Sequence, residues 1–441
     1  MMDFSYISRD FYIEIDHEVM IMDVGAILMY TVSYFGLFCA IFFLLTLFEN
    51  RQRLGSPRPQ KKLPKVTIMV PACNEEVCLA KTVNSLLSLD YPKKLLQIIV
   101  IDDGSTDKTL EIARRFEKKG VLVLTKPNGG KGTALNLGLE HATGEFVGCL
   151  DADSIVDPDA LKKMVGFFKR KTVMAVTPSL KCTKPKNLWQ RIQVIEFLLG
   201  VYLRKVYAYL GSIHVTPGPF TIFRKEFFDK YGGYDTSTCT EDIEICLRIQ
   251  ANKFEVENSV DANVYAVAMP TFFTMKKQRV RWYKGFIENM MKYKQLLSPK
   301  YGNLGIFILP SAFLSIATAS TIVVYSMWQM ISTNWQRAIN LYNVNFDVWK
   351  LLRLNWDWFY FNQSPLMFIG LLALGMGVTM IYLAKRLSNE KMPLSASYVL
   401  FMFFYLPLYV FWWGAAAKAK ITNQNVGWAG RKRNNVEYKY T

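Results

Sequence analysis

The sequence predicts an α/β fold for the central part of the chain, built on a mainly parallel sheet, with long apolar helices before and after it. Two observations predict this. Between residues 64 and 300, short apolar runs alternate with helical segments, which is typical of parallel strands joined by right-handed crossovers. Uncharged apolar stretches flank this region, and each has the roughly 20 residues that a helix needs to cross a bilayer.

Composition excludes several classes of protein. The 441 residues are 51% hydrophobic, which is too apolar for a disordered chain. Seven scattered cysteines and three well-separated histidines exclude a small disulfide scaffold and a histidine-rich zinc site. The formal net charge is +17. High apolarity with a strong positive charge favours a membrane protein with basic cytosolic faces, and a nucleic-acid-binding protein is the alternative.

Four stretches are predicted to be transmembrane or re-entrant helices: residues 24–48, 305–328, 365–384 and 393–416. The first is not a removable signal, because it is too long and follows acidic residues. The region between the first and second stretches is large enough for a domain with its own core.

Loop charge predicts the orientation. Residues 1–23 carry six acids and one arginine, whereas six lysines and arginines lie between residues 51 and 65. The positive-inside rule therefore places the N-terminus outside and the large domain in the cytosol of a multi-pass cell-membrane protein. The basic tail, residues 417–441, also favours the cytosol, yet three further spans would leave it outside. One span is therefore miscounted: either residues 335–361 are interfacial or partly inserted, or one apolar segment is re-entrant.

The central region has its own predicted elements. Strands are expected at residues 66–70, 98–101, 121–124 and 146–150, and helices near residues 77–88, 107–118 and 131–141. In sheets of this kind, ligands bind outside the carboxyl ends of the strands. Polar residues should therefore collect at those ends.

Acidic and polar residues do follow the strands. Asn74 and Glu75 follow the first strand, Asp102 and Asp103 end the second, and an Asp-x-Asp pair follows the fourth. A single acid at a strand end is usually a helix N-cap, which is the interpretation favoured for Asp107. Clusters at three strand ends favour a ligand-binding edge.

Asp151 and Asp153 are the candidate metal ligands. In extended backbone, residues i and i+2 point the same way, so both carboxylates can face one cation whose shell pyrophosphate oxygens complete. Mg²⁺ or Mn²⁺ is favoured over zinc because no histidine or cysteine cluster lies nearby. Asp-x-Asp alone is a common pattern, and its place at a strand end strengthens the metal interpretation.

A glycine-rich stretch, residues 128–132, opens the helix after the third strand. Its backbone N–H groups and Lys131 are suited to phosphate. The stretch lacks the Walker spacing, and a plain glycine loop explains it equally well.

Two further groups carry candidate chemistry. Glu241 and Asp242 precede an apolar helix, where they either favour the helix start or supply a general base for an acceptor hydroxyl. Gln278, Arg281 and Trp282 share one helix face and suit a pyrophosphate and a sugar ring. The alternative for them is a basic interfacial helix with a membrane-belt tryptophan.

Five motifs occur in order: Pro71…Asn74-Glu75, Asp102-Asp103-Gly104-Ser105, Asp151-Ala152-Asp153, Thr240-Glu241-Asp242 and Gln278-x-x-Arg281-Trp282. In this order and spacing they resemble the membrane-embedded family 2 glycosyltransferases. That family includes poly-N-acetylglucosamine, hyaluronan, chitin and cellulose synthases. The resemblance covers about residues 64–300.

The resemblance implies a GT-A fold, with a Rossmann-like, mainly parallel sheet in the cytosolic domain. It also implies an inverting, metal-dependent transfer from a UDP-sugar, either UDP-GlcNAc or UDP-glucose, to a growing β-linked polysaccharide, and leaves open whether the polymer crosses the membrane. The alternative is a non-processive transferase with a glycolipid product, similar to ceramide glucosyltransferases. Nucleic acid is not expected as a partner, because the basic clusters flank the spans and the sheet edge is acidic.

The resemblance also implies roles for single residues. Asp103 would read the uracil, Asp151 would sit near the ribose or phosphate, Asp153 would hold Mg²⁺ or Mn²⁺, and Asp242 would be the catalytic base. Further donor and acceptor contacts are implied for Pro71, Asn74, Glu75, Lys131, Gly218, Pro219, Glu241, Gln278, Arg281 and Trp282. Interface helices are expected at about residues 188–209 and 275–294.

Overall fold

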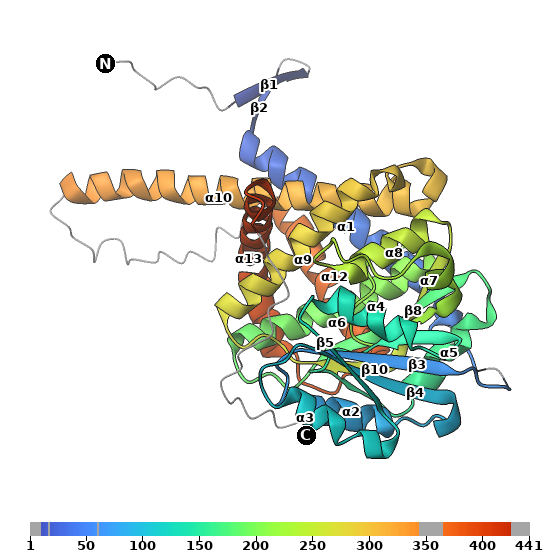
Figure 1. Ribbon diagram of the computed structural model, residues 1–441. Helices are drawn as coiled ribbons and strands as arrows, with labels where there is room; N and C mark the ends of the chain where they lie inside the picture. Colours follow the sequence, from blue (N-terminus) through green and yellow to red (C-terminus); the bar gives the residue numbers. More distant parts are fainter. Residues whose placement is uncertain (1–9, 16–17, 60, 344–364, 425–441) are drawn as a thin grey trace. The chain divides into compact units, whose positions relative to one another are not determined.

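The computed structural model describes residues 10–15, 18–59, 61–343 and 365–424 (Figure 1). The chain divides into two units. One consists of residues 1–44 and 312–380, and the other of residues 45–311 and 381–441. The second unit carries the large sheet and every residue of the candidate site.

An eight-stranded sheet forms the centre of the second unit, in the order β5-β4-β3-β6-β9-β8-β10-β7. Strands β3, β4, β5 and β6 are mutually parallel, and β8 is parallel to β10, whereas β9 and β7 run antiparallel to their neighbours. The predicted mainly parallel sheet is thus confirmed. The strands are β3 (Val66–Ala72), β4 (Leu96–Asp103), β5 (Leu122–Lys126), β6 (Phe146–Cys149), β7 (Ile155–Val156), β8 (Val173–Cys182), β9 (Thr221–Arg224) and β10 (Glu255–Ala266).

Strand β3 lies at the middle of the parallel part and is buried along its whole length. Because side chains alternate across a strand, Ile68 belongs to one core with the helices on one face, and Met69 belongs to a second core on the other. A parallel strand covered on both faces needs a continuous apolar run, which is what the sequence has here.

Short helices cover both faces of the sheet (Figure 1). Helices α2 (Leu79–Leu87) and α5 (Ala160–Val165) supply buried side chains to the first core. Helices α4 (Lys131–Glu140), α7 (Lys225–Tyr231) and α8 (Glu241–Ala251) supply them to the second. The three helices expected from the sequence are α2, α3 (Thr109–Arg114) and α4.

Two long helices follow the stretches expected to lie at an interface: α6 (Leu188–Tyr209) and α9 (Phe272–Lys292). Asn187 caps α6 by accepting the Gln190 N–H, and a capping box between Thr271 and Thr274 starts α9. Both helices pack against α13 (Ser395–Ile421) through a small apolar cluster that includes Met275 and Trp412. That α6 and α9 lie at a membrane surface stays a prediction.

The other apolar helices are α1 (Val24–Glu49), α10 (Leu309–Asn343) and α12 (Pro365–Leu387). Within the described residues, four helical stretches are long and apolar enough to cross a membrane: Gly25–Glu49, Leu304–Ser332, Met367–Leu387 and Ser395–Ile421. They coincide with the four stretches predicted from the sequence. Most of the ambiguous stretch 335–361 and of the basic tail 417–441 lies outside the described residues.

The N-terminal segment, expected outside the membrane, contains a hairpin of β1 (Asp10–Ile15) and β2 (Glu18–Asp23), which pair antiparallel. Its side of the membrane stays a prediction.

Candidate active site

At the carboxyl edge of the parallel strands, two acids from distant parts of the chain lie beside one lysine. Lys131, the first residue of α4, marks the meeting point. Its Nζ lies 2.7 Å from Oδ1 of Asp151, which follows β6, and 3.1 Å from Oε1 of Glu241, which begins α8. Two acids from separate segments therefore meet at the ammonium group of a third.

This ammonium group is held in its charged form. Burial alone would lower the pKa of Lys131, but the carboxylates of Asp151 and Glu241 outweigh it and raise the pKa well above its usual value. Gly218 lies against the same group, since a Cβ there would come within 2.8 Å of Lys131 Nζ. A glycine at position 218 therefore leaves room for the lysine.

Asp242 is the second residue of α8 and stands beside this cluster. Its Oδ1 accepts the Ile243 N–H at 2.9 Å, and its carbonyl accepts the Thr216 hydroxyl at 2.6 Å. Burial and the neighbouring Glu241 carboxylate raise the pKa of Asp242 to about 6, although Lys131 and Arg281 oppose the shift. For Glu241 the balance is reversed: burial would raise its pKa, but Lys131 and Arg281 lower it.

Two adjacent carboxylates with pKa values pushed apart are a common acid–base arrangement in enzymes. Here the ion pair with Lys131 lowers the pKa of Glu241, while the pKa of Asp242 is raised to about 6. These opposite pKa shifts favour Asp242 over Glu241 as a group that can accept a proton.

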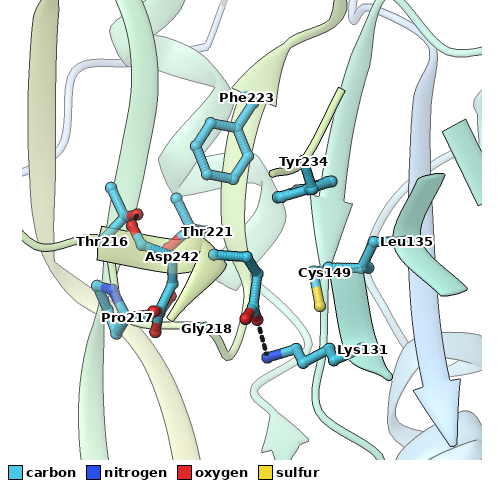
Figure 2. A pocket seen from close by; sticks show the side chains of 11 residues that line it. Lys131, Leu135, Cys149, Thr216, Pro217, Gly218, Thr221, Phe223, Tyr234 and Asp242 are labelled. Atoms are coloured by element: carbon cyan, nitrogen blue, oxygen red, sulfur yellow. Dashed lines mark hydrogen bonds and ion pairs between the residues drawn. The ribbon is translucent and has the colours of Figure 1, made fainter. Parts of the chain in front are cut away.

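A pocket lies at this place (Figure 2). It is lined by Lys131, Leu135, Cys149, Thr216, Pro217, Gly218, Thr221, Phe223, Tyr234, Glu241 and Asp242. The charged residues come from the starts of α4 and α8, and the others come from α4, β6, β9, the loop before β9 and the loop after α7. Figure 2 shows Lys131 and Asp242 among these side chains. Sequence reasoning missed Thr216, Phe223 and Tyr234, because they carry no charge pattern and come from segments far apart in the chain.

The candidate metal ligands lie just after β6, in a turn closed by the bond from the Ser154 N–H to the Asp151 carbonyl at 2.9 Å. The extended backbone expected for this pair from the sequence is therefore wrong. The side chains of Asp151 and Asp153 are both partly exposed, and the Ser154 hydroxyl contacts Asp153 Oδ1 at 3.3 Å. Within the described residues, no group of three or more histidine, cysteine or acidic side chains is arranged to hold a metal ion. A pair of carboxylates fits a Mg²⁺-type ion that takes its remaining ligands from substrate phosphates and water. The donor set therefore suits a cation that arrives with a nucleotide.

The end of β4 contacts the glycine stretch, and the expected contact of Asp103 with uracil stays a prediction. The Asp103 carboxylate is fully buried and accepts hydrogen bonds from Lys126 Nζ at 2.7 Å and from the N–H groups of Gly129 at 3.0 Å and Gly130 at 2.8 Å. Two N–H groups of the glycine stretch are thus directed at Asp103. This favours the plain glycine loop over a phosphate cradle for those two groups.

The next turn requires a glycine. Gly104 has a φ of +67°, and a Cβ there would lie 2.6 Å from the Asn128 backbone nitrogen. The Asp-Asp-Gly-Ser motif thereby brings β4 and the glycine stretch into contact.

The residues after β3 are tied to the same turn. Pro71 lies within β3 and pairs in register with Ile101. Asn74, with a φ of 55°, accepts the Thr106 N–H through Oδ1 at 2.8 Å, and the Glu75 N–H donates to Thr109 Oγ1 at 2.8 Å. These bonds hold Asn74 in the strand-end turn, and its expected contact with substrate stays a prediction.

Asp107, one residue before the N-cap Lys108 of α3, also contacts this turn. It accepts the N–H of Thr109 at 2.9 Å and that of Glu76 at 3.3 Å. Its side chain thus binds the first backbone N–H group of α3.

The three motif residues of α9, Gln278, Arg281 and Trp282, do not contact the same group. Arg281 Nη1 donates to the Cys239 carbonyl at 3.0 Å, which places it beside the segment that leads to Asp242. Gln278 instead accepts a hydrogen bond from Arg279, and the Arg279 guanidinium lies 4.1 Å from the centroid of the Trp282 ring. Sequence reasoning missed Arg279. The sequence signal that could have identified Arg279 is its place on the apolar side of the amphipathic helix α9.

Comparison with known proteins gives the following results. Residues 67–232 match the family model described as Glycosyl transferase family 2. A poly-β-1,6-N-acetyl-D-glucosamine synthase of Staphylococcus epidermidis is 33% identical over 232 residues, which are 52% of this chain and 56% of that protein. A β-monoglucosyldiacylglycerol synthase of Nostoc sp. is 32% identical over 244 residues, 54% of this chain and 52% of that protein. The chain spans about half the length of the curated relatives it matches.

A solved structure shows the fold. The mannosyltransferase PcManGT from Pyrobaculum calidifontis, solved in complex with GDP-Man and Mn²⁺, superposes with a TM-score of 0.55 at 18% sequence identity. The superposition covers 90% of this chain and 100% of that one. The expected GT-A fold is confirmed.

Proposed function

Because residues 67–232 form a glycosyl transferase family 2 domain, we propose that this chain transfers a sugar from a UDP-sugar to a growing β-linked polysaccharide, with inversion at the anomeric carbon. The observation that carries the proposal is Asp242, a pocket carboxylate whose pKa lies at about 6. The names of the two groups of relatives support N-acetylglucosamine or glucose as the transferred sugar.

The chain's own residues account for the proposed reaction. Asp242 removes the proton of an acceptor hydroxyl, which then attacks the anomeric carbon of the donor from the opposite side to the nucleotide. Glu241 stays ionised on Lys131 and keeps the pKa of Asp242 raised. Arg281, next to the same segment, supplies positive charge for the departing nucleotide. A single base suffices, so no second carboxylate nucleophile is needed.

Asp153, together with Asp151, would hold a divalent cation, Mg²⁺ or Mn²⁺. When bound, such an ion supplies charge stabilisation for the leaving group. The Mn²⁺ in a mannosyltransferase of the same fold is consistent with this proposal.

Replacing the proposed metal ligand is a direct test. Asp153→Ala should abolish the dependence of transfer on Mg²⁺ or Mn²⁺ and lower the rate by at least about 100-fold, because the departing charge loses its counter-ion. The measurement is initial rate against metal concentration. Asp159→Ala removes an exposed acid that pairs with Lys163 and should leave the metal titration unchanged. An unaltered metal titration in Asp153→Ala would reject the ligand role.

The pH dependence follows from Asp242. A general base works only when deprotonated. With a pKa of about 6, transfer at subsaturating donor should be low at pH 5, half-maximal near pH 6 and constant from about pH 7 to 8. A profile that is flat between pH 5 and 7, measured by initial rates, would contradict Asp242 as the base.

A second candidate function is transfer of one sugar to a lipid. The matching β-monoglucosyldiacylglycerol synthase supports it, since its identity to this chain equals that of the polysaccharide synthase to within one percentage point. The acceptor would then be a glycolipid precursor in the bilayer.

One experiment separates the two functions. Purified protein in lipid nanodiscs is supplied with labelled UDP-GlcNAc or UDP-glucose, with and without diacylglycerol, and the products are sized. A polymer formed without added diacylglycerol supports the polysaccharide function. A single sugar on lipid, with no polymer, would replace it by the lipid function, and no transfer from either donor would overturn both.

The cellular placement is also proposed. The four apolar stretches support a membrane protein, and the charge distribution supports a multi-pass protein of the cell membrane with the transferase domain in the cytosol. Protease accessibility of the transferase domain in sealed inverted vesicles tests this orientation.

A further inference from the structure

A buried ion pair joins the two long helices α6 and α9. Arg279 of α9 has no exposed surface. Its Nε lies 3.1 Å from Glu196 Oε1 and its Nη2 lies 2.5 Å from Glu196 Oε2, so that the guanidinium and the carboxylate of α6 bind in a two-point arrangement. Paired contacts of this kind fix geometry as well as energy.

The remaining Arg279 nitrogen and the face of the guanidinium contact two neighbouring residues of α9, Gln278 and Trp282. Nη1 donates to Gln278 Oε1 at 2.6 Å, and the guanidinium carbon lies 4.1 Å from the centre of the Trp282 ring. A cation over an indole face at this distance is an attractive contact. Arg279 therefore contacts two of the three α9 residues that the sequence marks as substrate contacts.

The ion pair also reaches the C-terminal helix α13. The Tyr405 hydroxyl donates to Glu196 Oε1 at 3.2 Å, and the Arg279 guanidinium lies 5.9 Å from the centre of the Trp412 ring. Three helices thus meet at one charged centre. A buried pair is weak evidence for stability, and specifying one arrangement of helices is its better-supported use.

The opposite face of α9 contacts the segment that leads to the catalytic acid. A Cβ at Gly285 would collide with the Thr240 side chain, so α9 and this segment touch closely. Asn289 Nδ2 donates to Thr240 Oγ1 at 3.0 Å, and Arg281 Nη1 donates to the Cys239 carbonyl at 3.0 Å. A shift of α9 would therefore move the residues immediately before Glu241 and Asp242.

We propose that Arg279, held by Glu196, is a positioning residue for the transfer reaction: it orients Gln278 and Trp282 and fixes the position of α9 against the start of α8. The inference rests on the proposed glycosyl transfer. It assigns no contact with substrate to Arg279 itself, because the side chain is buried and its three nitrogens bind Glu196 and Gln278.

A structural role and a positioning role of Arg279 predict different results for the variant Arg279→Lys. A lysine keeps the positive charge for Glu196 but is a point donor, and does not hold Glu196 at two points and Gln278 together. We expect Arg279→Lys to keep its melting temperature within about 3 °C of wild type, while kcat falls at least about tenfold and the Kd for UDP changes less than about threefold. Arg279→Gln should lower both kcat and the melting temperature.

A matched control separates stability from positioning. Leu161→Ala opens a cavity in the core on the far side of the sheet from α8 and should lower the melting temperature as much as Arg279→Gln or more. Assayed below its melting temperature, it should keep kcat within twofold. If kcat follows the melting temperature through all three variants, the pair is merely structural and the positioning proposal is overturned.

A measurement without catalysis completes the test. In Arg279→Lys, amide hydrogen exchange should accelerate at least about fivefold over residues 236–242 and 278–282, with no change in α4. Unchanged exchange in both segments would overturn the proposal even if the wild type transfers no sugar. An inactive wild type would overturn the proposed function alone, so the two failures are distinguishable.

Discussion

Asp242→Asn should lower kcat for sugar transfer by about 10²- to 10⁴-fold, which is the usual contribution of a general base. Asparagine has the shape of aspartate and keeps a side-chain oxygen for the Ile243 N–H that Asp242 accepts. The helix start and the pocket should therefore survive. Binding of UDP, measured by calorimetry, should stay within about twofold of wild type, since the substitution removes a proton acceptor and leaves the nucleotide contacts in place.

A matched control is Asp229→Asn. Asp229 lies on α7, is largely exposed and pairs with Lys225 one helical turn away, so kcat should change less than twofold. If Asp242→Asn retains more than a tenth of the wild-type rate, another group accepts the proton. If UDP binding is lost as well, Asp242 is not simply the base.

The acidic edge was predictable from sequence because it depends on local patterns. In β3, β4 and β6, apolar runs end abruptly in polar residues, and the carboxyl ends of parallel strands necessarily meet at one edge. The position of Asp151 near Lys131 follows from that topology. Asp242 needed the resemblance as well, since an acid at a helix start has an ordinary structural explanation.

The other half of the sheet was not predictable in the same way. Strand β9 has four residues and runs antiparallel between β6 and β8. Its place in the sheet is set by long-range pairing and not by a sequence period. Strand β10 mixes apolar with acidic and amide residues over Glu255–Ala266, so no apolar run marks it.

The sequence also did not predict which charged residues pair with each other. Glu196 and Arg279 are 83 positions apart, and each by itself is one of several charges on its helix. The Asp103 carboxylate, expected to face a nucleotide, also holds the N–H groups of Gly129 and Gly130, which follow a different strand. Local sequence gives the residue types, and the tertiary fold decides which of them pair.

The second large effect is expected at Lys131. Its ammonium lies between Asp151 and Glu241, with side-chain exposures of 10%, 32% and 9% respectively. Lys131→Met would leave two carboxylates uncompensated beside Asp242. Removing one partner of a buried pair is worth about 3–5 kcal/mol of stability. Because Asp151 is nearly one-third exposed and water screens part of its charge, we expect the low end, about 3 kcal/mol.

The same substitution should change the pH profile in a defined direction. Lys131 lowers the pKa of Asp242 against the combined effect of burial and Glu241. Without the lysine, the pKa of Asp242 should rise above about 6, and the midpoint of the transfer profile should move toward neutral pH. The remaining activity at pH 6.5 should then fall by a larger factor than the activity at pH 8.

Lys162→Met is the control for Lys131→Met. Lys162 pairs with Asp90 at 2.6 Å, but the two side chains are 36% and 65% exposed, so its loss should change stability by less than about 1 kcal/mol and leave the pH midpoint in place. Denaturant unfolding and initial rates from pH 5 to 8 measure both effects. A midpoint that stays at about 6 in Lys131→Met would show that the lysine does not set the charge state of the base, because removing a cation next to a carboxyl group can only raise its pKa.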